Sequence, residues 1–343
     1  METLFQQLTE EVKTKYTIEK EDFDIPVLPQ AQCIVIPIIR EAIAPLIIRN
    51  NDADMVTDMF AAGQLRIRMI ASKNKGVERR RGSQILRTLS ATLGSDLGGK
   101  AAANKAFIKD KTNASEVFDL NTFVFGDAAN GANKAIYPVH AAVLYSDALS
   151  IQSLEEPLID DVFRQGGISE DYVSFDAQKH QTSSNIFTTR AVLPGTLFVQ
   201  TLVMIGKRMT REALNHLLLS IGVAGCYGGA TATTGTNLKT HLCGIYWGSF
   251  ERAINAPQEM LAQLGEQPKP IISDMIAQVT QMFAEHYPHN VPAETLTQHV
   301  ETLVQDFENE DETLLAEYQQ ASEQMKTLFD AWFTPPSKQS KKK

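Results

Sequence analysis

The stretch from residue 31 to 50 constrains the fold most, because its density of isoleucine and valine suits only a buried sheet. Its sequence is AQCIVIPIIREAIAPLIIRN, and β-branched side chains favour strands. Pro37 and Pro45 lack the N–H that a strand ladder needs, so we expect them at an edge or a bend. A further strand is expected over 65–71, where alternation places Arg66 and Arg68 on one face.

Two helices have clear start signals. Ser83 is a good N-cap for a helix of about ten residues that ends near Gly94. Its apolar stripe is Ile85, Leu86, Leu89 and Leu93. Thr210 caps a second helix, whose expected buried stripe is Ala213, Leu214, Leu217, Leu218 and Ile221.

The order of elements is strand, helix, strand, insertion, strand, helix, glycine-rich loop, strand. This order is typical of an α+β fold with helices on one face of an antiparallel sheet, in the ferredoxin-like or RRM-like manner with long insertions and a helical C-terminal region. We divide the chain into 1–94, the first half of the core with the basic loop and helix; 95–187, projecting insertions around a core strand at 136–151; 188–250, the second half with the glycine-rich loop; 251–334, an acidic helical region; and 335–343, a disordered basic tail.

Charge is distributed unevenly along the chain. The net charge is −9, yet residues 66–111 hold twelve Lys and Arg against three Asp and Glu, and residues 251–334 hold three against fifteen. A local basic field can hold a phosphate backbone on an acidic protein. A solvated charged surface would have the same composition, so the charge alone does not decide.

The remaining features of the composition indicate where in the cell the protein is expected. No run of about 18 apolar residues is present, so we expect no membrane-spanning helix. The first residues lack the basic and apolar segments of a signal peptide. Three scattered cysteines do not form a disulfide scaffold and fit a reducing cytoplasm.

Two segments favour RNA binding. Three arginines, 79–81, come before Gly82 and the expected helix start, where free N–H groups and the helix dipole attract phosphate. The loop at 222–236 is rich in glycine and threonine, which allow a close backbone approach and hydroxyl contacts to phosphate or ribose. A loop that binds nothing is the alternative. The candidate RNA-binding residues are Lys73, Lys75, Arg79, Arg80, Arg81, Ser83, Arg87, Gly228, Gly229, Thr231, Thr233, Thr234, Asn237 and Lys239.

Other reactive side chains make a weaker case. Cys226, His241 and Cys243 lack the close-spaced pairs of a zinc site, so no metal or other cofactor is expected. Single carboxylates near strand ends usually form caps and turns. No nucleophile is paired with a base, so we expect no catalytic residue. The residues considered were Asp52, Asp54, Asp127, Asp147 and His180.

Four segments, in order, resemble motifs of the RAMP superfamily of CRISPR proteins. Residues 81–87 are similar to its glycine-serine turn into the first helix, with Arg81 in place of proline. Phe125-Gly126, followed by residues 143–148, resembles the FG and DA pairing of the superfamily. Residues 192–198 resemble its Pro-Gly-Thr-x-Phe entry to the second half of the core, and residues 222–236 resemble its glycine-rich loop. The segments at 125–131, 137–150 and 192–203 are most similar to the Cascade backbone subunit of type I-D systems.

The resemblance implies a subunit that multimerises as a filament along guide RNA (crRNA) without reading its sequence. It implies target DNA or RNA, copies of the same chain and other effector subunits as partners, in the cytoplasm. A projecting thumb would displace one base at intervals, with Tyr172, Phe175 or Phe187 as the candidate wedge.

Three alternatives remain open. A type III-like backbone subunit would cut target RNA with a metal at Asp52 or Asp54. A guide-processing endoribonuclease of the same superfamily would need a histidine-based site, and no histidine here has a clearly catalytic setting. An RNA-binding protein outside CRISPR systems, with an RRM-like core, would need an aromatic RNP pattern that we do not find.

Overall fold

A computed structural model describes residues 1–8, 32–48, 56–94, 97, 118–126, 140–154, 159–165, 174–176, 181–183, 186–206, 209–229 and 234–333. Between 159 and 189, and at 330–333, the description covers the backbone alone. Within these ranges, no helix combines the length and the apolar character needed to cross a membrane.

The core is one antiparallel sheet centred on β1 (Cys33–Ala42) and β10 (Leu197–Ile205). Within the described residues its strands follow the order β13-β12-β1-β10-β5-β3-β2, with β11 also beside β1 and β4 also beside β10. The other bounds are β2 (Asp58–Ala61), β3 (Gln64–Met69), β4 (Val143–Tyr145), β5 (Ala148–Ser150), β11 (Leu238–Leu242), β12 (Ile245–Gly248) and β13 (His289–Val291).

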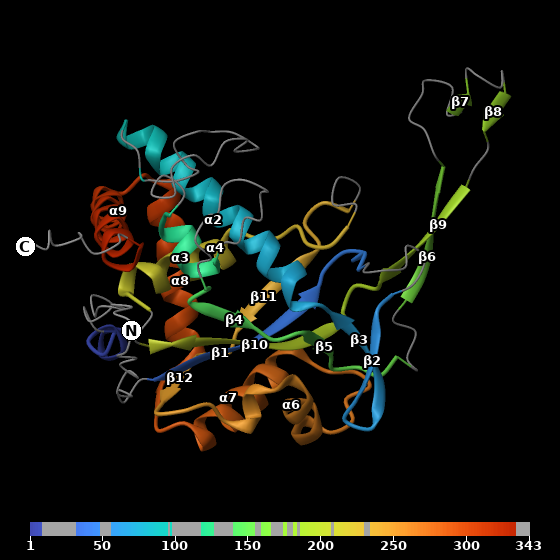
Figure 1. Cartoon of the computed structure of the whole chain (residues 1–343). Helices are drawn as coiled ribbons and strands as arrows, with labels where there is room; N and C mark the ends of the chain where they lie inside the picture. Colours follow the sequence, from blue (N-terminus) through green and yellow to red (C-terminus); the bar gives the residue numbers. More distant parts are fainter. Residues whose placement is uncertain are drawn as a thin grey trace, which may run out of the picture.

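Helices cover both faces of this sheet (Figure 1). The first face carries α2 (Ala71–Leu93), α3 (Leu120–Phe125), α4 (Arg211–Gly222), α8 (Ala293–Glu308) and α9 (Glu312–Phe333). The second face carries η4 (Ala253–Asn255), α6 (Pro257–Leu264) and α7 (Ile272–His286). The α+β class is therefore confirmed. The prediction that helices cover one face of the sheet is wrong, because the acidic C-terminal region supplies α6 and α7 to the second face.

Strand β1 shows why the sheet is buried on both sides. Successive side chains point to opposite faces. Ile34, Ile36 and Ile38 pack under α2 and α4, and Cys33 and Val35 pack over α6 and α7. Burying one such isoleucine contributes roughly 1.5–3 kcal/mol. By the same alternation, the next residue on the first face after Ile38 is charged, and this residue is central to the site below.

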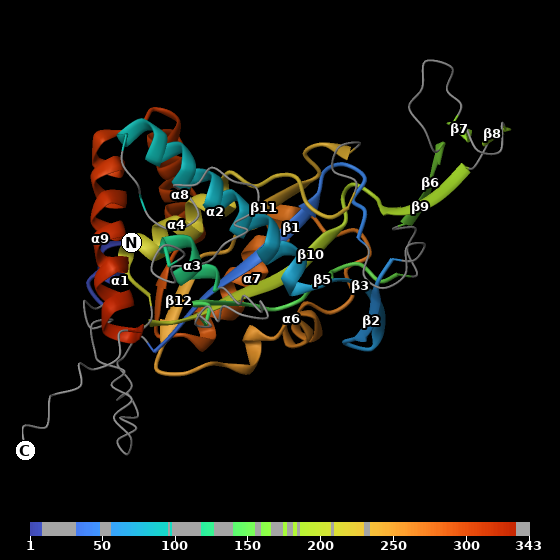
Figure 2. The same ribbon diagram turned by 45° about the horizontal axis from the view of Figure 1, so that its top comes forward.

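A two-stranded ribbon leaves the sheet at residues 159–192. Strand β6 (Ile159–Gln165) pairs with β9 (Ile186–Val192), and β7 (Ser174–Asp176) pairs with β8 (Gln181–Ser183) further along. Figures 1 and 2 both show this ribbon extending away from the sheet. The hairpin expected in the second insertion is confirmed. Most of the first insertion lies outside the described residues, and so does the C-terminal tail; α1 (Glu2–Phe5) gives the chain a helical start.

The prediction that Pro37 lies at a sheet edge or a bend is wrong, because β1 is a central strand. Pro37 is tolerated because the strand on that side changes there: β12 pairs with residues 33–35 and β11 with residues 38–42. The Pro37 carbonyl accepts a hydrogen bond from the N–H of Cys243, which lies between β11 and β12. The single strand expected after the glycine-rich loop is therefore two strands, and the one expected at 136–151 is likewise split into β4 and β5.

Helix α4 follows its sequence signals. Thr210 Oγ1 accepts from the N–H of Ala213 at 3.1 Å, and the expected apolar stripe is buried. Helix α2 does not: it ends at Gly94, as expected, but begins at Ala71 and not at Ser83. Its first N–H, that of Ala71, donates to Asp147 Oδ1 at 2.8 Å. The carboxylate of Asp147, distant in the sequence, thus caps the N-terminus of α2.

Candidate nucleic-acid interface

The three consecutive arginines lie in the middle of α2, so the predicted anion site at a helix N-terminus is wrong. Consecutive helical residues turn by about 100°, and the three side chains therefore diverge. Arg80 is exposed, whereas Arg79 and Arg81 are half-buried on opposite sides of the helix. One phosphate cannot meet all three arginines at once.

The other basic residues of α2 divide in the same way. Lys73 and Arg87 lie seven residues on either side of Arg80, which places the three along one side of the helix, with Lys73 and Arg80 exposed and Arg87 half-buried. Lys75 is half-buried next to Arg79; burial lowers its pKa, and the charge of Arg79 lowers it further. Burial and the neighbouring cation both disfavour the charged form of Lys75. The structure therefore spreads the predicted basic cluster around the helix.

Ser83 is an internal residue of α2 and not its cap. Its hydroxyl accepts from Asn121 Nδ2 at 2.9 Å, and the same amide group donates to the Arg79 carbonyl at 3.1 Å. Gly82 beside it permits the close approach of α3 and α4: an added Cβ would meet Asn121 Oδ1 first, and would lie 2.8 Å from His216 Nε2 and 2.9 Å from Ser220 Oγ. Gly82 and Ser83 thus serve the packing of α2 against its neighbouring helices and are not a helix start.

The glycine-rich loop is fixed at two points. Gly228 has φ +76, and a Cβ there would collide with the Ile47 carbonyl oxygen; the N–H of Gly229 donates to that oxygen at 2.8 Å. Asn237 is fully buried, and it bonds both the N–H and the carbonyl of Tyr227 at 2.9 Å. Asn237 therefore supports the loop and does not face solvent.

The threonines of the loop are only partly described. Thr234 Oγ1 accepts from Asn237 Nδ2 at 3.2 Å. The predicted contacts Thr231 and Thr233 lie outside the described residues. Lys239 follows on β11 and is exposed.

A groove of about 930 Å³ brings the two predicted segments together. Arg81 of α2 lines it with residues 222–226 of the loop, and Lys239 lines it from β11. Helix α8 forms another wall and contributes Glu294 and Glu301. A strand of phosphates could follow the basic side of this groove and would be repelled from the acidic wall.

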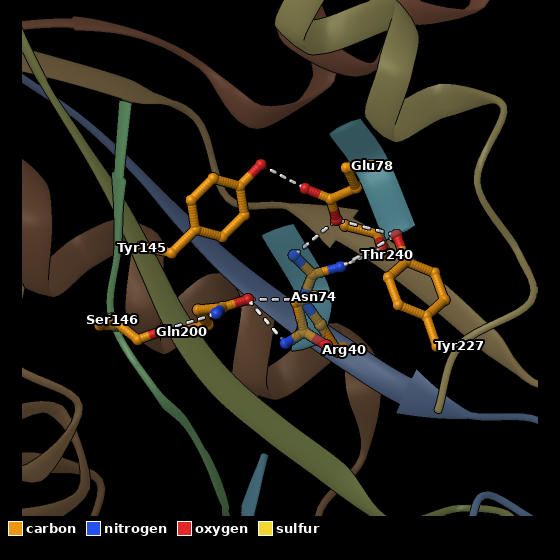
Figure 3. A network of polar contacts seen from close by, with 8 residues as sticks. All are labelled: Arg40, Asn74, Glu78, Tyr145, Ser146, Gln200, Tyr227 and Thr240. Atoms are coloured by element: carbon orange, nitrogen blue, oxygen red, sulfur yellow. Dashed lines mark hydrogen bonds and ion pairs between the residues drawn. The ribbon is translucent and has the colours of Figure 1, made fainter. Parts of the chain in front are cut away.

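A buried polar network (Figure 3) reaches the groove through Thr240, which lines the groove and bonds Arg40. Arg40 of β1 pairs with Glu78 of α2 at 2.8 Å, and both side chains are fully buried. Tyr227 donates to Glu78 Oε1 at 2.8 Å, and Tyr145 donates to Glu78 Oε2. The pKa of Arg40 is raised: burial would lower it, but the Glu78 carboxylate outweighs that effect. Arg40 thus keeps its positive charge inside the protein.

The remaining bonds of Arg40 reach two strands. Its Nε donates to Gln200 Oε1 at 2.6 Å, and its Nη1 donates to Thr240 Oγ1 at 3.1 Å and to Tyr227 Oη at 3.3 Å. Burial raises the pKa of Tyr227, and the Glu78 carboxylate raises it further, so the phenol stays a donor. Gln200 is also bonded by Asn74 of α2 at 3.3 Å.

Sequence reasoning missed Arg40, Glu78 and Tyr227. Two signals could have identified the pair. Arg40 ends an otherwise apolar run, and Glu78 is the only acidic residue between positions 66 and 95. A charged residue that follows an apolar strand pattern indicates a buried partner elsewhere.

The cysteine and histidine residues do not form a metal site. His241 Nε2 lies 2.8 Å from Glu41 Oε2, Cys226 Sγ lies 3.9 Å from Thr236 Oγ1, and Cys243 is buried. In the described part of the chain, no three potential ligands gather closely enough for a metal ion.

The carboxylates that the sequence singled out are described at one position. Asp147 pairs with Arg68 at 2.6 Å in addition to its bond to α2, which confirms the cap-and-turn interpretation there. Asp52, Asp54, Asp127 and His180 lie outside the described residues. So does Tyr172, and for Phe175 on β7 and Phe187 on β9 the description does not extend to the side chains.

Comparison with known proteins identifies a family. Residues 5–330 match the family model described as Csc2 Crispr. Among solved structures, the crystal structure of Thermofilum pendens Csc2 aligns with a TM-score of 0.51 at 13% identity, over 87% of this chain and 89% of that chain. This likeness establishes a shared fold. No curated protein matches the chain.

Two further solved structures align over less of the chain. A chain of a CRISPR RNA-guided surveillance complex in a pre-nicking state aligns with a TM-score of 0.45 at 11% identity, over 74% of this chain and 88% of that chain. A chain of a type IV-B CRISPR complex aligns with a TM-score of 0.38 at 17% identity, over 69% and 96%.

Proposed function

Because the chain belongs to the Csc2 CRISPR family, we propose that it is a guide-RNA-binding backbone subunit of a surveillance complex of the type I-D Cascade kind. In this proposal several copies line one guide RNA in the cytoplasm. They grip phosphate and ribose without reading bases, and they assist recognition of target DNA or RNA alongside other effector subunits. The subunit needs no cofactor and performs no catalysis of its own.

The observation that carries the proposal is the groove shared by α2 and the glycine-rich loop. Arg81 and Lys239 supply positive charge on two elements far apart in the sequence, and the partly exposed residues 222–226 line the groove between them. Arginine and backbone N–H groups are the usual partners of phosphate oxygens. Contacts of this kind position a nucleic acid and carry no sequence information.

The covered sheet supports this mode of binding over the RRM mode. RRM domains stack bases on aromatic residues of an open sheet face. Here helices pack on both faces, and the large aromatic residues of β12, Tyr246 and Trp247, are buried. In this proposal RNA therefore binds at the helix and loop surface, and the ribbon of β6 and β9 is the projecting thumb.

The test is binding of single-stranded RNA across a salt series, with Mg²⁺ present. The variant carries Arg79→Ala, Arg80→Ala and Arg81→Ala. The matched control carries Arg252→Ala, Lys269→Ala and Lys326→Ala, the three basic residues of the acidic region 251–334. Both lose three positive charges. We expect the first variant to bind on the order of 100-fold more weakly and its salt slope to fall by up to about 2, at about 0.7 for each lost phosphate contact.

The control is expected to bind as the wild type does. Equal losses in the two variants would reduce the effect to net charge and contradict the proposed site. The RNA is also run on a denaturing gel. Intact RNA supports a coating subunit, whereas Mg²⁺-dependent cleavage that Asp52→Ala or Asp54→Ala abolishes would establish the type III-like alternative.

A further inference from the structure

The network of Arg40, Glu78 and Tyr227 has no direct part in the proposed grip. All three side chains are fully buried, so none of them can touch RNA. Buried ion pairs are also weak stabilisers, because their desolvation offsets much of their attraction, and apolar replacements of similar volume are often as stable. Stability alone therefore does not explain why a charged pair lies in this core.

The network joins the two walls of the groove. Glu78 belongs to α2 and lies three residues, or about one helical turn, before Arg81. A fixed Glu78 therefore fixes the rotation of α2 and with it the direction of Arg81. Tyr227 belongs to the glycine-rich loop and directly follows Cys226, a residue of the groove wall. The Glu78 carboxylate thus bonds α2 to the sheet and to the loop, with oxygen distances of 2.8 Å to Arg40 Nη2 and 2.8 Å to Tyr227 Oη.

The sheet supplies the fixed reference. Arg40 lies on β1 at the centre of the sheet and also bonds Gln200 of β10 and Thr240 of β11. Thr240 is the next residue after Lys239, so the same guanidinium is bonded beside the second basic residue of the groove. The buried amide of Asn237 holds the backbone of Tyr227 and completes the connection from sheet to loop.

We propose that Arg40, Glu78 and Tyr227 are positioning residues that hold α2 and the glycine-rich loop in one relative setting, so that Arg81 and Lys239 engage the same RNA backbone. This inference rests on the proposed function. It makes two statements that a purely structural role does not make. Loosening the network weakens RNA binding without removing a phosphate contact, and the loss depends on the presence of Arg81.

The first experiment compares Tyr227→Phe with Tyr246→Phe. Each removes one hydroxyl from a fully buried tyrosine, but Tyr246 donates to the carbonyls of Cys243 and Thr280 on the opposite face of the sheet. Because Tyr227 bonds charged groups, we expect its loss to lower RNA affinity about 10-fold. We expect the slope of affinity against salt to stay that of the wild type, because Arg81 still makes its phosphate contact in the complex and the loss lies in aligning it beforehand. Tyr246→Phe is expected to bind normally.

The second experiment repeats Tyr227→Phe in an Arg81→Ala background. If Tyr227 acts by directing Arg81, its own effect shrinks to about 3-fold or less once Arg81 is gone. Thermal unfolding of each variant confirms that folded protein is compared. Wild-type affinity in Tyr227→Phe, or an equal loss in both backgrounds, overturns the inference and leaves the RNA grip standing. Absence of salt-sensitive RNA binding by the wild type overturns the proposed function and the inference with it.

Discussion

The two faces of the central sheet bury different chemistry. Under α2 and α4 the sheet buries an ion pair, with Arg40 and Glu78 both fully covered. Over α6 and α7 the buried cluster is formed by apolar, sulfur and phenol groups, including Phe283 stacked on Tyr287 with ring centroids 6.2 Å apart. The buried Arg66 at the edge of that face donates to the carbonyls of Ser150 and Ile151 rather than to a carboxylate.

The two faces therefore contribute differently: one stabilises the fold, and the other fixes the relative orientation of its elements. An apolar face stabilises the fold without fixing direction strongly, because apolar contacts are not directional. A hydrogen-bonded ion pair costs desolvation but fixes geometry. The face with the ion pair is also the face whose helix and loop line the groove. The comparison therefore teaches that the buried ion pair lies on the face of the proposed RNA grip.

The largest effect is expected from breaking the pair on one side only. Glu78→Leu leaves Arg40 charged and unpaired in the core, which should cost about 3–5 kcal/mol of unfolding free energy. Tyr246→Phe on the other face should cost about 1 kcal/mol, as for an ordinary hydrogen bond. Chemical denaturation measures both. Similar costs for the two variants would mean that the ion pair is not buried as described.

A smaller effect is expected where α2 meets α4. Gly82→Ala places a Cβ against Asn121 of α3 and against His216 and Ser220 of α4, and should cost about 2–3 kcal/mol by overpacking. Gly76 lies in the same helix with nothing within 4 Å of an added Cβ, so Gly76→Ala should stabilise by up to about 1 kcal/mol. Thermal unfolding compares them. The same sign for both variants would contradict the close approach of the two helices.

The smallest effect is a pH dependence from the same face. Burial lowers the pKa of His216 from its ordinary 6.5 to about 3; its Nε2 donates to Asn121, and its Nδ1 accepts from Tyr318. The unfolded chain takes up the proton first, so this stability is complete above pH 6.5 and is lost as the pH falls toward 3. Relative to His216→Gln, the wild type should lose about 2 kcal/mol between pH 7 and pH 5. Parallel pH profiles of the two proteins would show that His216 titrates normally.

Local signals were sufficient for much of the fold. Thr210 begins α4, Gly94 ends α2, and the isoleucine-rich run forms β1, because each depends on neighbouring residues. The start of α2 could not be predicted, since its first N–H is bonded by Asp147, seventy-six residues away. Gly82 also misled, because glycine usually interrupts a helix and here serves the contact with α4.

The candidate site was predictable in composition but not in arrangement. The basic segment and the glycine-rich loop were identified, and the structure brings Arg81 and Lys239 into one groove with that loop. The divergence of the three arginines follows from a helix that starts twelve residues earlier than its local signal. Asn237 and Ser83 were assigned to RNA because polar residues look alike in a sequence, whether they face solvent or bond the protein itself.

The central claim is that RNA binds on the face with the buried ion pair, at α2 and the glycine-rich loop. Photo-crosslinking of a 4-thiouridine-labelled single-stranded RNA, with the attached peptides identified by mass spectrometry, tests this most directly. The account predicts crosslinks within residues 71–93 and 222–241 that disappear with rising salt, and none within residues 253–286 on the opposite face. Crosslinks concentrated at 253–286, or none in either segment at low salt, would contradict it.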